Sequence, residues 1–454
     1  MDALVRVIVR ARKDAKAVRA ALERFFPDWP VEVVSLHGVR GAEEILDAVM
    51  SARRRGCLHL VLLGRREEGA ARLVQEEAPL DTVAHVVPRA RVRNARLEMI
   101  AGELVEALSV FSSGVYWRPV GGGRVVYSAS PKPPRGFGRV EGLPMGVGAD
   151  PFLALGMWRR LLGARGLSVG ADPLIVKTGS AGEHLVYQAG SRVARLILGH
   201  TATSVEVLGG YEPVDVDVGG CVEASMGYLR LLEDSAVSML RRAGEGVDRV
   251  VVPWSGGKDS TAALLLAVKA FGRGGVEAVY VDTGLDYAFT RRYLDMVAGM
   301  LGVEYRVVEA PVARLVREGW RLSIGYRWCT GLKLEALKSY VSRLDGRVLL
   351  VVGDRGAESQ RRLWRTPLGR ERLLGAAGRA APLKAWGAIH VQLYLLANRV
   401  PLHPLYALGF YRIGCCLCPS LREWEVSASL RVGAVRSQLP GWALSLLEPP
   451  RGEA

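Results

Sequence analysis

The segment 255–260, with the sequence SGGKDS, has the residue types and spacing needed to hold a chain of phosphates. Its two glycines let backbone N–H groups approach phosphate oxygens without a Cβ in the way. A helical pattern follows at 261–271, so the N-terminus of that helix would add partial positive charge. Lys258 offers a point charge to a phosphate oxygen. The segment therefore predicts a phosphate-binding loop.

The two residues after the lysine separate this loop from a Walker A loop. That pattern requires Ser or Thr directly after the lysine, whereas Asp259 follows Lys258 here. Asp259 and Ser260 instead lie where their side chains could cap the helix or hold Mg²⁺. We expect phosphates, with Mg²⁺, as the ligand of this loop.

Cysteine is the second residue type that suggests chemistry. The six cysteines are Cys57, Cys221, Cys329, Cys415, Cys416 and Cys418. Three of them fall within four positions, which in a cytoplasmic chain indicates metal or redox chemistry ahead of a disulfide framework. We interpret Cys57 and Cys221 as buried apolar packing.

Composition limits the class of protein and its partners. With 49% hydrophobic and 24% charged residues the chain is typical of a globular protein. We expect it to be cytoplasmic, with no membrane partner, because no apolar run could cross a bilayer and the charged N-terminus is unlike a secretory signal. The net charge of +15 favours phosphate-rich partners such as nucleic acid, although an Arg-rich, heat-adapted proteome explains it too. The basic segment 89–96 fits either phosphate contact or a solvated face.

The pattern along the chain predicts several units that would position these residues. Alternating strand and helix patterns indicate a small α/β domain at 1–110. A Gly- and Pro-rich stretch at 111–149 is interpreted as a linker. Short strand patterns at 150–222 predict a β-rich module that could bind RNA. The predicted nucleotide domain covers 223–425. Residues 426–454 are interpreted as a C-terminal tail.

Polar residues follow the successive strand patterns of the predicted nucleotide domain. Strands at 250–252, 276–282 and 347–352 end at Ser255, Asp282 and Gly353. In a doubly wound parallel sheet the carboxyl ends of the strands meet at one edge, where ligands bind. We therefore expect these endings to converge on one nucleotide.

Several motifs together resemble the phosphoadenosine phosphosulfate (PAPS) reductase family of the PP-loop, adenine nucleotide alpha-hydrolase superfamily. They are SGGKDS, DTGL at 282–285, RWCTGLK at 327–333, the element leading to Glu358, Ser359 and Arg362, PLKAW at 382–386, and NRVPLHPLY at 398–406 followed by GCCLC. The resemblance covers about residues 245–425 and implies an α/β fold with a doubly wound parallel sheet. It also implies roles for particular residues. The implied nucleotide-binding set is Ser255, Gly256, Gly257, Lys258, Asp259, Ser260, Asp282, Thr283, Gly353 and Arg362. The implied catalytic set is Lys258, Asp259 and Arg355, with Lys333 near phosphate or sulfate.

The cysteines depart from the family's two patterns. Reductases of the family use a cysteine near the C-terminus as nucleophile, and no cysteine follows Cys418. Cluster-bearing relatives hold [4Fe–4S] with a Cys-Cys pair and a later Cys-x-x-Cys, whereas Cys329 has no neighbouring cysteine. Cys329, Cys415 and Cys418 could bind three irons of a cluster and leave the fourth open. With His403 they could instead make a Cys₃His zinc site, or they could be free thiols.

Three functions follow as hypotheses. The first is an enzyme that adenylates a substrate with ATP and Mg²⁺, for sulfur transfer to RNA such as tRNA, with an iron–sulfur centre. The second is a sulfonucleotide reductase that makes sulfite from PAPS or adenylyl sulfate. The third is a nucleotide-responsive nucleic-acid-binding protein that catalyses no reaction. The oligomeric state does not follow from the sequence.

Overall fold

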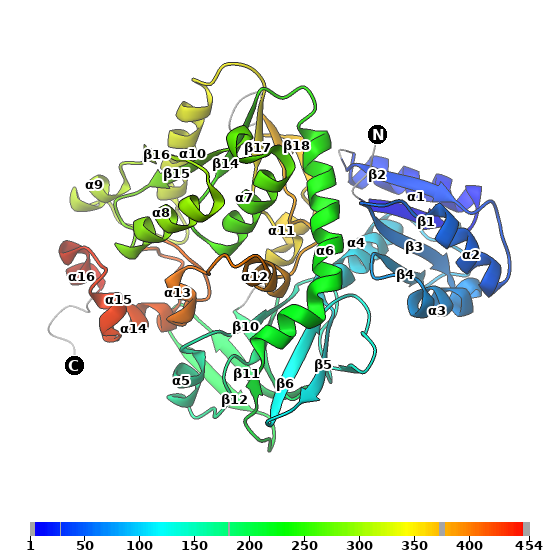
Figure 1. Ribbon diagram of the computed structural model, residues 1–454, viewed down its shortest axis with the longest axis horizontal. Coiled ribbons are helices and arrows are strands. Elements are labelled where there is room, and N and C mark those ends of the chain that lie inside the picture. Colours follow the sequence, from blue (N-terminus) through cyan, green and yellow to red (C-terminus); the bar gives the residue numbers. More distant parts are fainter. Residues whose placement is uncertain (1–4, 28, 180–181, 372–376, 448–454) are drawn as a thin grey trace.

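The computed structural model describes residues 5–27, 29–179, 182–371 and 377–447, which form four sheets with covering helices (Figure 1). In the view of Figure 1, the N-terminal unit lies on one side, the last sheet on the other, and the remaining two sheets below them. The long helix α6 (Val218–Ala243) runs between these parts.

The N-terminal unit is a parallel α/β layer, as predicted. Its strands are β1 (Val5–Val9), β2 (Val31–Ser35), β3 (Leu58–Gly64) and β4 (Thr82–Val87), in the order β2-β1-β3-β4. Its helices are α1 (Arg12–Phe25), α2 (Ala42–Ala52), α3 (Glu68–Glu77) and α4 (Leu97–Ser113). Every residue of β3 is buried, because a parallel strand covered on both faces needs a continuous apolar run.

The stretch interpreted as a linker is folded instead. Strands β5 (Val115–Val120), β6 (Arg124–Ala129) and β7 (Gly138–Arg139) join β13 (Asp215–Val216) in a sheet of order β13-β6-β5-β7. The linker interpretation at 111–149 was therefore wrong. Its Gly and Pro residues mark turns, while the buried run 125–129 supplies the strand that α6 packs against.

An antiparallel sheet follows, where a β-rich module was expected. It contains β8 (Ala149–Leu153), β9 (Leu174–Thr178), β10 (Glu183–Gln188), β11 (Ser191–Leu198) and β12 (Thr203–Val207). The strands lie in the order β12-β11-β10-β9-β8, and the short helix α5 (Trp158–Gly163) joins β8 to β9. All five residues of β8 are buried at the edge of this sheet.

The last sheet is the doubly wound one. Its order is β16-β15-β14-β17-β19-β18, and every neighbouring pair is parallel except β18–β19. The strands are β14 (Arg249–Pro253), β15 (Glu277–Asp282), β16 (Tyr305–Glu309), β17 (Val348–Val351), β18 (Leu368–Arg370) and β19 (Gly378–Ala380). This confirms the predicted fold class for this part of the chain.

Helices cover both faces of this sheet. Helix α10 (Trp328–Val341) packs on one face through Leu337 and Val341. The other face is covered by α6, α7 (Lys258–Phe271), α8 (Phe289–Leu301) and α12 (Ala388–Ala397). Two further short helices, α9 (Val312–Arg317) and α11 (Gln360–Leu363), lie in the connections.

The C-terminal stretch packs onto this domain. Helices α13 (Pro404–Ala407), α14 (Glu423–Arg431), α15 (Gly433–Arg436) and α16 (Gly441–Leu447) follow α12. Ala428, Val435 and Ala443 share a buried cluster with Leu285 and Cys416. Among the described residues, no helix is both long and apolar enough to cross a bilayer.

Candidate nucleotide site at the carboxyl edge of the six-stranded sheet

The loop 255–260 lies between β14 and α7 at the carboxyl edge of the sheet, as the strand-turn-helix pattern predicted. Gly256 has φ +75°, a conformation that side chains with a Cβ rarely adopt. Gly257 is the N-cap of α7 and contributes no side-chain cap. The N-terminal N–H groups of a 14-residue helix therefore point toward this edge without a capping side chain.

The two serines of the loop bond to the loop itself. Ser260 Oγ donates to Gly257 O (3.0 Å) and accepts from Ser255 N (3.2 Å). Ser255 Oγ lies 3.1 Å from Ser260 Oγ. These bonds close the loop into a compact turn, so Ser260 stabilises its shape.

Lys258 and Asp259 begin a chain of alternating charges. Lys258 Nζ lies 2.7 Å from Asp259 Oδ2, and Arg355 Nε lies 2.6 Å from Asp259 Oδ1. Burial alone would raise the pKa of Asp259, but the charges of Arg355 and Lys258 outweigh it and hold that pKa below its usual value. Both carboxylate oxygens are engaged by cations, so in this structure Asp259 holds Arg355 and Lys258.

The chain continues into the antiparallel sheet that precedes the nucleotide domain. Asp150 of β8 accepts two bonds from Arg355, from Nη1 at 2.9 Å and from Nη2 at 3.0 Å. Asp150 is 1% exposed and also accepts from Ala388 N (2.7 Å) at the start of α12. Burial acts to lower the pKa of Arg355, but Asp150 and Asp259 raise it well above its usual value. Arg355 is therefore a permanent, fixed cation between two domains.

Asp150 is the site residue that sequence reasoning missed. It is one carboxylate in the apolar run ADPFLAL at 149–155. A buried carboxylate requires a compensating partner, so its presence in an apolar strand was a usable signal. Nothing in the sequence names Arg355, more than two hundred positions later, as that partner.

Gly353 has no room for a side chain, because its backbone lies against that of Asp259 and Ser260. A Cβ at this position would lie 2.7 Å from Asp259 C and 2.8 Å from Ser260 N. The connection after β17 thus touches the first turn of α7, which brings Arg355 to the loop 255–260. The endings of β14 and β17 therefore lie close together, as expected.

The endings of β15 lie at the same edge but make other contacts. Asp282 Oδ1 accepts from Gly284 N (2.8 Å) in a turn, and its other oxygen lies 3.8 Å from Arg291. Thr283 is 1% exposed and its hydroxyl lies 3.3 Å from Cys415 Sγ. Thr283 therefore connects the nucleotide edge to the cysteine region.

Arg362 lies in α11 and pairs with two carboxylates. Its guanidinium bonds Glu358 and lies 3.6 Å from Asp354. Because its side chain is 41% exposed, it can still turn toward an anion. Its predicted contact with phosphate stays a prediction.

Three cysteines line one cavity of about 170 Å³ beside this edge. Cys329 comes from α10, and Cys415 and Cys418 come from the loop after α13. Lys333 Nζ lies 3.1 Å from Cys415 Sγ. Burial acts to lower the pKa of Lys333, but the nearby Cys415 and Asp286 raise it. Burial raises the pKa of Cys415.

The fourth ligand suggested for zinc does not fit. His403 is fully buried, with Nε2 3.2 Å from Thr290 Oγ1 and Nδ1 accepting from Leu405 N. Burial lowers the pKa of His403 to about 3, so it is a neutral core residue. Among the described residues, no group of three or more His, Cys, Asp and Glu side chains is arranged around a single ion. A mononuclear Cys₃His site is therefore not what this structure forms.

The donor set of this cavity consists of three thiols. Thiolates are the ligands of iron–sulfur clusters, and three cysteines share this cavity with Arg327, Lys333 and Arg412. These cations would balance the negative charge that thiolate ligands bring. Cys416 is not among the residues that line this cavity; it is fully buried, and burial raises its pKa to about 12.

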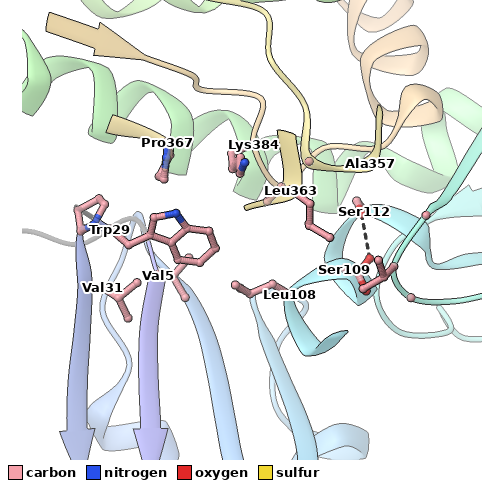
Figure 2. A pocket seen from close by; sticks show the side chains of 16 residues that line it. Val5, Trp29, Val31, Leu108, Ser109, Ser112, Ala357, Leu363, Pro367 and Lys384 are labelled. Carbon is pink, nitrogen blue, oxygen red and sulfur yellow. Dashed lines mark hydrogen bonds between the residues drawn. The ribbon is translucent and has the colours of Figure 1, made fainter. Parts of the chain in front are cut away.

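The N-terminal unit touches the connection that carries Arg355. A cavity of about 40 Å³ is lined by Val5, Trp29 and Val31 on one side and by Ala357, Leu363, Pro367 and Lys384 on the other (Figure 2). Burial lowers the pKa of Lys384 to about 7, and its Nζ bonds Arg362 O. The starts of β1 and β2 therefore support the segment that follows Arg355.

Comparison with known proteins gives one family and several partial relatives. Residues 249–421 match the model of the phosphoadenosine phosphosulfate reductase domain. The chain is 32% identical to an uncharacterized protein of Methanocaldococcus jannaschii over 210 residues, which are 45% of this chain and 44% of that protein. The chain is also 38% identical to sulfate adenylyltransferase subunit 2 of Mycobacterium bovis over 101 residues, which are 22% of this chain and 32% of that protein. The matches thus span less than half of each of these relatives.

A solved structure of PAPS reductase from Candida auris, as a phosphate complex, aligns with 19% identity and a TM-score of 0.33. The alignment covers 42% of this chain and 95% of that one.

Proposed function

We propose that this chain, which carries a PAPS reductase domain over residues 249–421, binds ATP at the loop 255–260 and adenylates an acceptor for sulfur transfer, with RNA as the acceptor class. An acceptor oxygen would attack the α-phosphorus of ATP. The bond between the α-phosphorus and the bridging oxygen to the β-phosphorus would break, and pyrophosphate would leave with Mg²⁺.

The observation that carries this proposal is the fixed charge chain at the helix N-terminus. Lys258 lies in the first turn of α7, held by Asp259, and Arg355 is held by Asp150 and Asp259. Cations that are already in place need no reorganisation as negative charge develops on a leaving pyrophosphate. The Lys258 side chain can exchange Asp259 for a phosphate oxygen, whereas Arg355, with three bonds, would hold Asp259 in position.

The cysteine cavity supports the sulfur-transfer part of the proposal. Cys329, Cys415 and Cys418 would hold an iron–sulfur cluster, which when bound supplies a site for sulfide or for a sulfur-bearing ligand. Lys333 contacts Cys415 and Thr283 contacts the same sulfur. These two residues link the cavity to the strand endings where the nucleotide would lie.

One observation favours a second candidate, a sulfonucleotide reductase. Cys415 Sγ has Lys333 beside it at 3.1 Å and lies at the nucleotide edge. The Lys333 cation acts to lower the pKa of this thiol and so favours the thiolate that such a reaction requires, although burial leaves the pKa of Cys415 raised overall. Sulfite would then be the product, made without pyrophosphate.

Product analysis separates the candidates. Purified protein, prepared without oxygen, would be incubated with labelled ATP and bulk RNA, or with PAPS or adenylyl sulfate and a thiol reductant. We expect pyrophosphate from ATP and AMP attached to the RNA, because no sulfur donor is present to displace AMP, and we expect no sulfite. Sulfite from either sulfonucleotide would establish the reductase instead. Tight ATP binding with neither product would leave a nucleotide-responsive binding protein.

Iron and sulfide analysis tests the cofactor separately. We expect a brown protein whose visible absorbance is lost when Cys329, Cys415 or Cys418 is changed to Ala. The matched control is Cys416→Ala, because Cys416 is fully buried and is not among the residues that line the cavity. Colour that survives all three changes would contradict the assigned ligands.

A further inference from the structure

Exposed arginines gather at the carboxyl ends of three neighbouring strands of the N-terminal sheet. Arg12 follows β1, Arg65 and Arg66 follow β3, and Arg89 and Arg93 follow β4. We call these five residues the arginine edge. β1, β3 and β4 are adjacent in the sheet. The proposed reaction uses none of these residues.

Backbone contacts hold the arginine edge in place. Arg65 N donates to Arg89 O (2.8 Å) and Arg66 N to Ala90 O (3.3 Å), so the loops after β3 and β4 continue the pairing of their strands. A Cβ at Gly64 would lie 2.5 Å from Arg91 Cα. These arginines therefore project from a fixed backbone rather than from two independent loops.

The acidic groups beneath the arginine edge are already paired. Glu67 lies 3.0 Å from Arg10 and 3.5 Å from Arg91, both partly buried. Asp14 is 2% exposed, accepts from Arg93 N and lies 3.6 Å from the Arg93 side chain. Across the ranges that the structure describes, no carboxylate oxygen lies within 4 Å of the side-chain nitrogens of Arg65, Arg66 or Arg89. Arg65, Arg66 and Arg89 thus present uncompensated positive charge to solvent.

The place of the edge in the sheet suits an anion. The connection after β1 leads to β2 on one side, and the connection after β3 leads to β4 on the other side. The carboxyl ends of two strands whose connections diverge in this way form the usual ligand crevice. Helix α1 begins there at Arg12 with Ala11 as an N-cap that has no capping side chain. Its N–H groups add to the charge of the arginines.

The direction of the strands favours a long ligand over a small one. Val5 and Val31 begin β1 and β2 and line the cavity against Leu363 and Pro367, from which the strands run away (Figure 2). Five residues of strand place the arginine edge about 17 Å beyond that cavity. A small substrate held there would not reach the loop 255–260, whereas a polymer can contact both.

We propose that the arginine edge binds the phosphate backbone of a structured RNA. A guanidinium matches the oxygens of a phosphate with two parallel bonds. The segment 89–93, RARVR, contains no aromatic residue for base stacking, so contacts with the backbone and little dependence on sequence are expected. The choice of RNA rests on the proposed function, in which RNA is the acceptor. Binding itself needs no ATP and can be measured alone.

The test is a fluorescence titration of a labelled RNA hairpin without nucleotide, at salt from about 50 to about 200 mM. The variant is Arg65→Glu/Arg66→Glu/Arg89→Glu. The control is Arg249→Glu/Arg306→Glu/Arg343→Glu, three exposed arginines of the six-stranded-sheet domain with the same change in charge. We expect the variant to bind roughly 10-fold more weakly or worse, with a salt slope smaller by about 2–3, and the control to stay near the wild type.

Several outcomes would overturn the proposal. They are equal weakening by the control, no binding of RNA by the wild type, and binding of a DNA duplex or of anionic lipid vesicles as tightly as RNA. A Lys258→Met chain that still binds RNA but releases no pyrophosphate would show that RNA binding by the arginine edge is independent of the proposed reaction. Unchanged thermal unfolding of the triple variant excludes misfolding as the cause of weak binding.

Discussion

The six-stranded sheet and the N-terminal sheet both carry basic side chains at the carboxyl ends of parallel strands. In the six-stranded sheet Arg355 is 2% exposed and forms bonds with Asp150 and Asp259. In the N-terminal sheet Arg65 and Arg89 are exposed, and the carboxylates nearby are paired with other arginines.

The difference shows two ways of presenting positive charge. A buried charge requires compensation, and its geometry is then fixed, which suits one small anion in one orientation. An exposed guanidinium contributes little to stability and is screened by salt, which suits a polyanion with many equivalent contacts. The four predictions below test the buried half of this comparison.

The largest effect is expected at Asp150. Asp150→Asn leaves Arg355 buried with one carboxylate fewer, and breaking a buried pair in this way costs about 3–5 kcal/mol of unfolding free energy. Denaturant unfolding measures it. The control is Glu206→Gln in the same antiparallel sheet, where an exposed pair with Arg195 at 3.9 Å should contribute at most about 1 kcal/mol. Equal losses in the two variants would remove the distinction between buried and exposed charge.

Lys258 is expected to affect reaction rather than stability. Lys258→Met removes the cation that would face the leaving pyrophosphate, and loss of one such group slows the chemical step about 100- to 1,000-fold. Pyrophosphate release per minute is the measurement. Lys269→Met lies on the same helix, where Lys269 pairs with Glu233 at 2.6 Å, and should keep the wild-type rate. A rate for Lys258→Met close to that of this control would contradict the assigned role.

Gly353 tests the backbone contact that joins the two strand endings. Gly353→Ala would place a Cβ 2.7 Å from Asp259 C, and overpacking of this kind costs about 1–3 kcal/mol. Nucleotide affinity should fall with it, because Arg355 moves with the connection. Gly299→Ala, in α8 with nothing within 4 Å of the new Cβ, should not destabilise the domain. Thermal unfolding and nucleotide titration of both variants provide the check.

Acid should lower the unfolding free energy through three buried histidines. Burial lowers the folded pKa of His390 and of His403 to about 3 and that of His184 to about 4. The unfolded value is about 6.5, so the unfolded chain takes up protons first as the pH falls. The stability from these histidines is complete above about pH 6.5 and is lost as the pH falls toward the folded values. Each histidine should cost about 1–2 kcal/mol between pH 7 and pH 5.

The variant His403→Gln measures one of these contributions. Its unfolding free energy should fall less between pH 7 and pH 5 than that of the wild type. The same change at exposed His37 should leave the pH dependence as it is. A pH dependence in His403→Gln that matches the wild type would show that His403 is protonated in the folded protein as well.

Much of the PP-loop half followed from local patterns. The loop 255–260, its flanking strand and helix, and the strand endings at Asp282 and Gly353 depend on short-range signals such as glycine in a turn and apolar periodicity. The error at 111–149 has the same origin, because Gly and Pro mark turns between strands as readily as they mark linkers. His403 was an ambiguous residue, and its neutral state depends on Thr290, Leu405 and their burial.

The sequence alone determined that a glycine-containing loop opens a helix after a buried strand, and that its domain is α/β, because these features depend on residues next to one another. The tertiary structure decided which charges are compensated. Asp150 and Arg355 lie far apart in the chain, and their pairing depends on the edge of an antiparallel sheet meeting the start of α12. Burial gives such a pair its effect, and burial is a property of the packed molecule rather than of any segment.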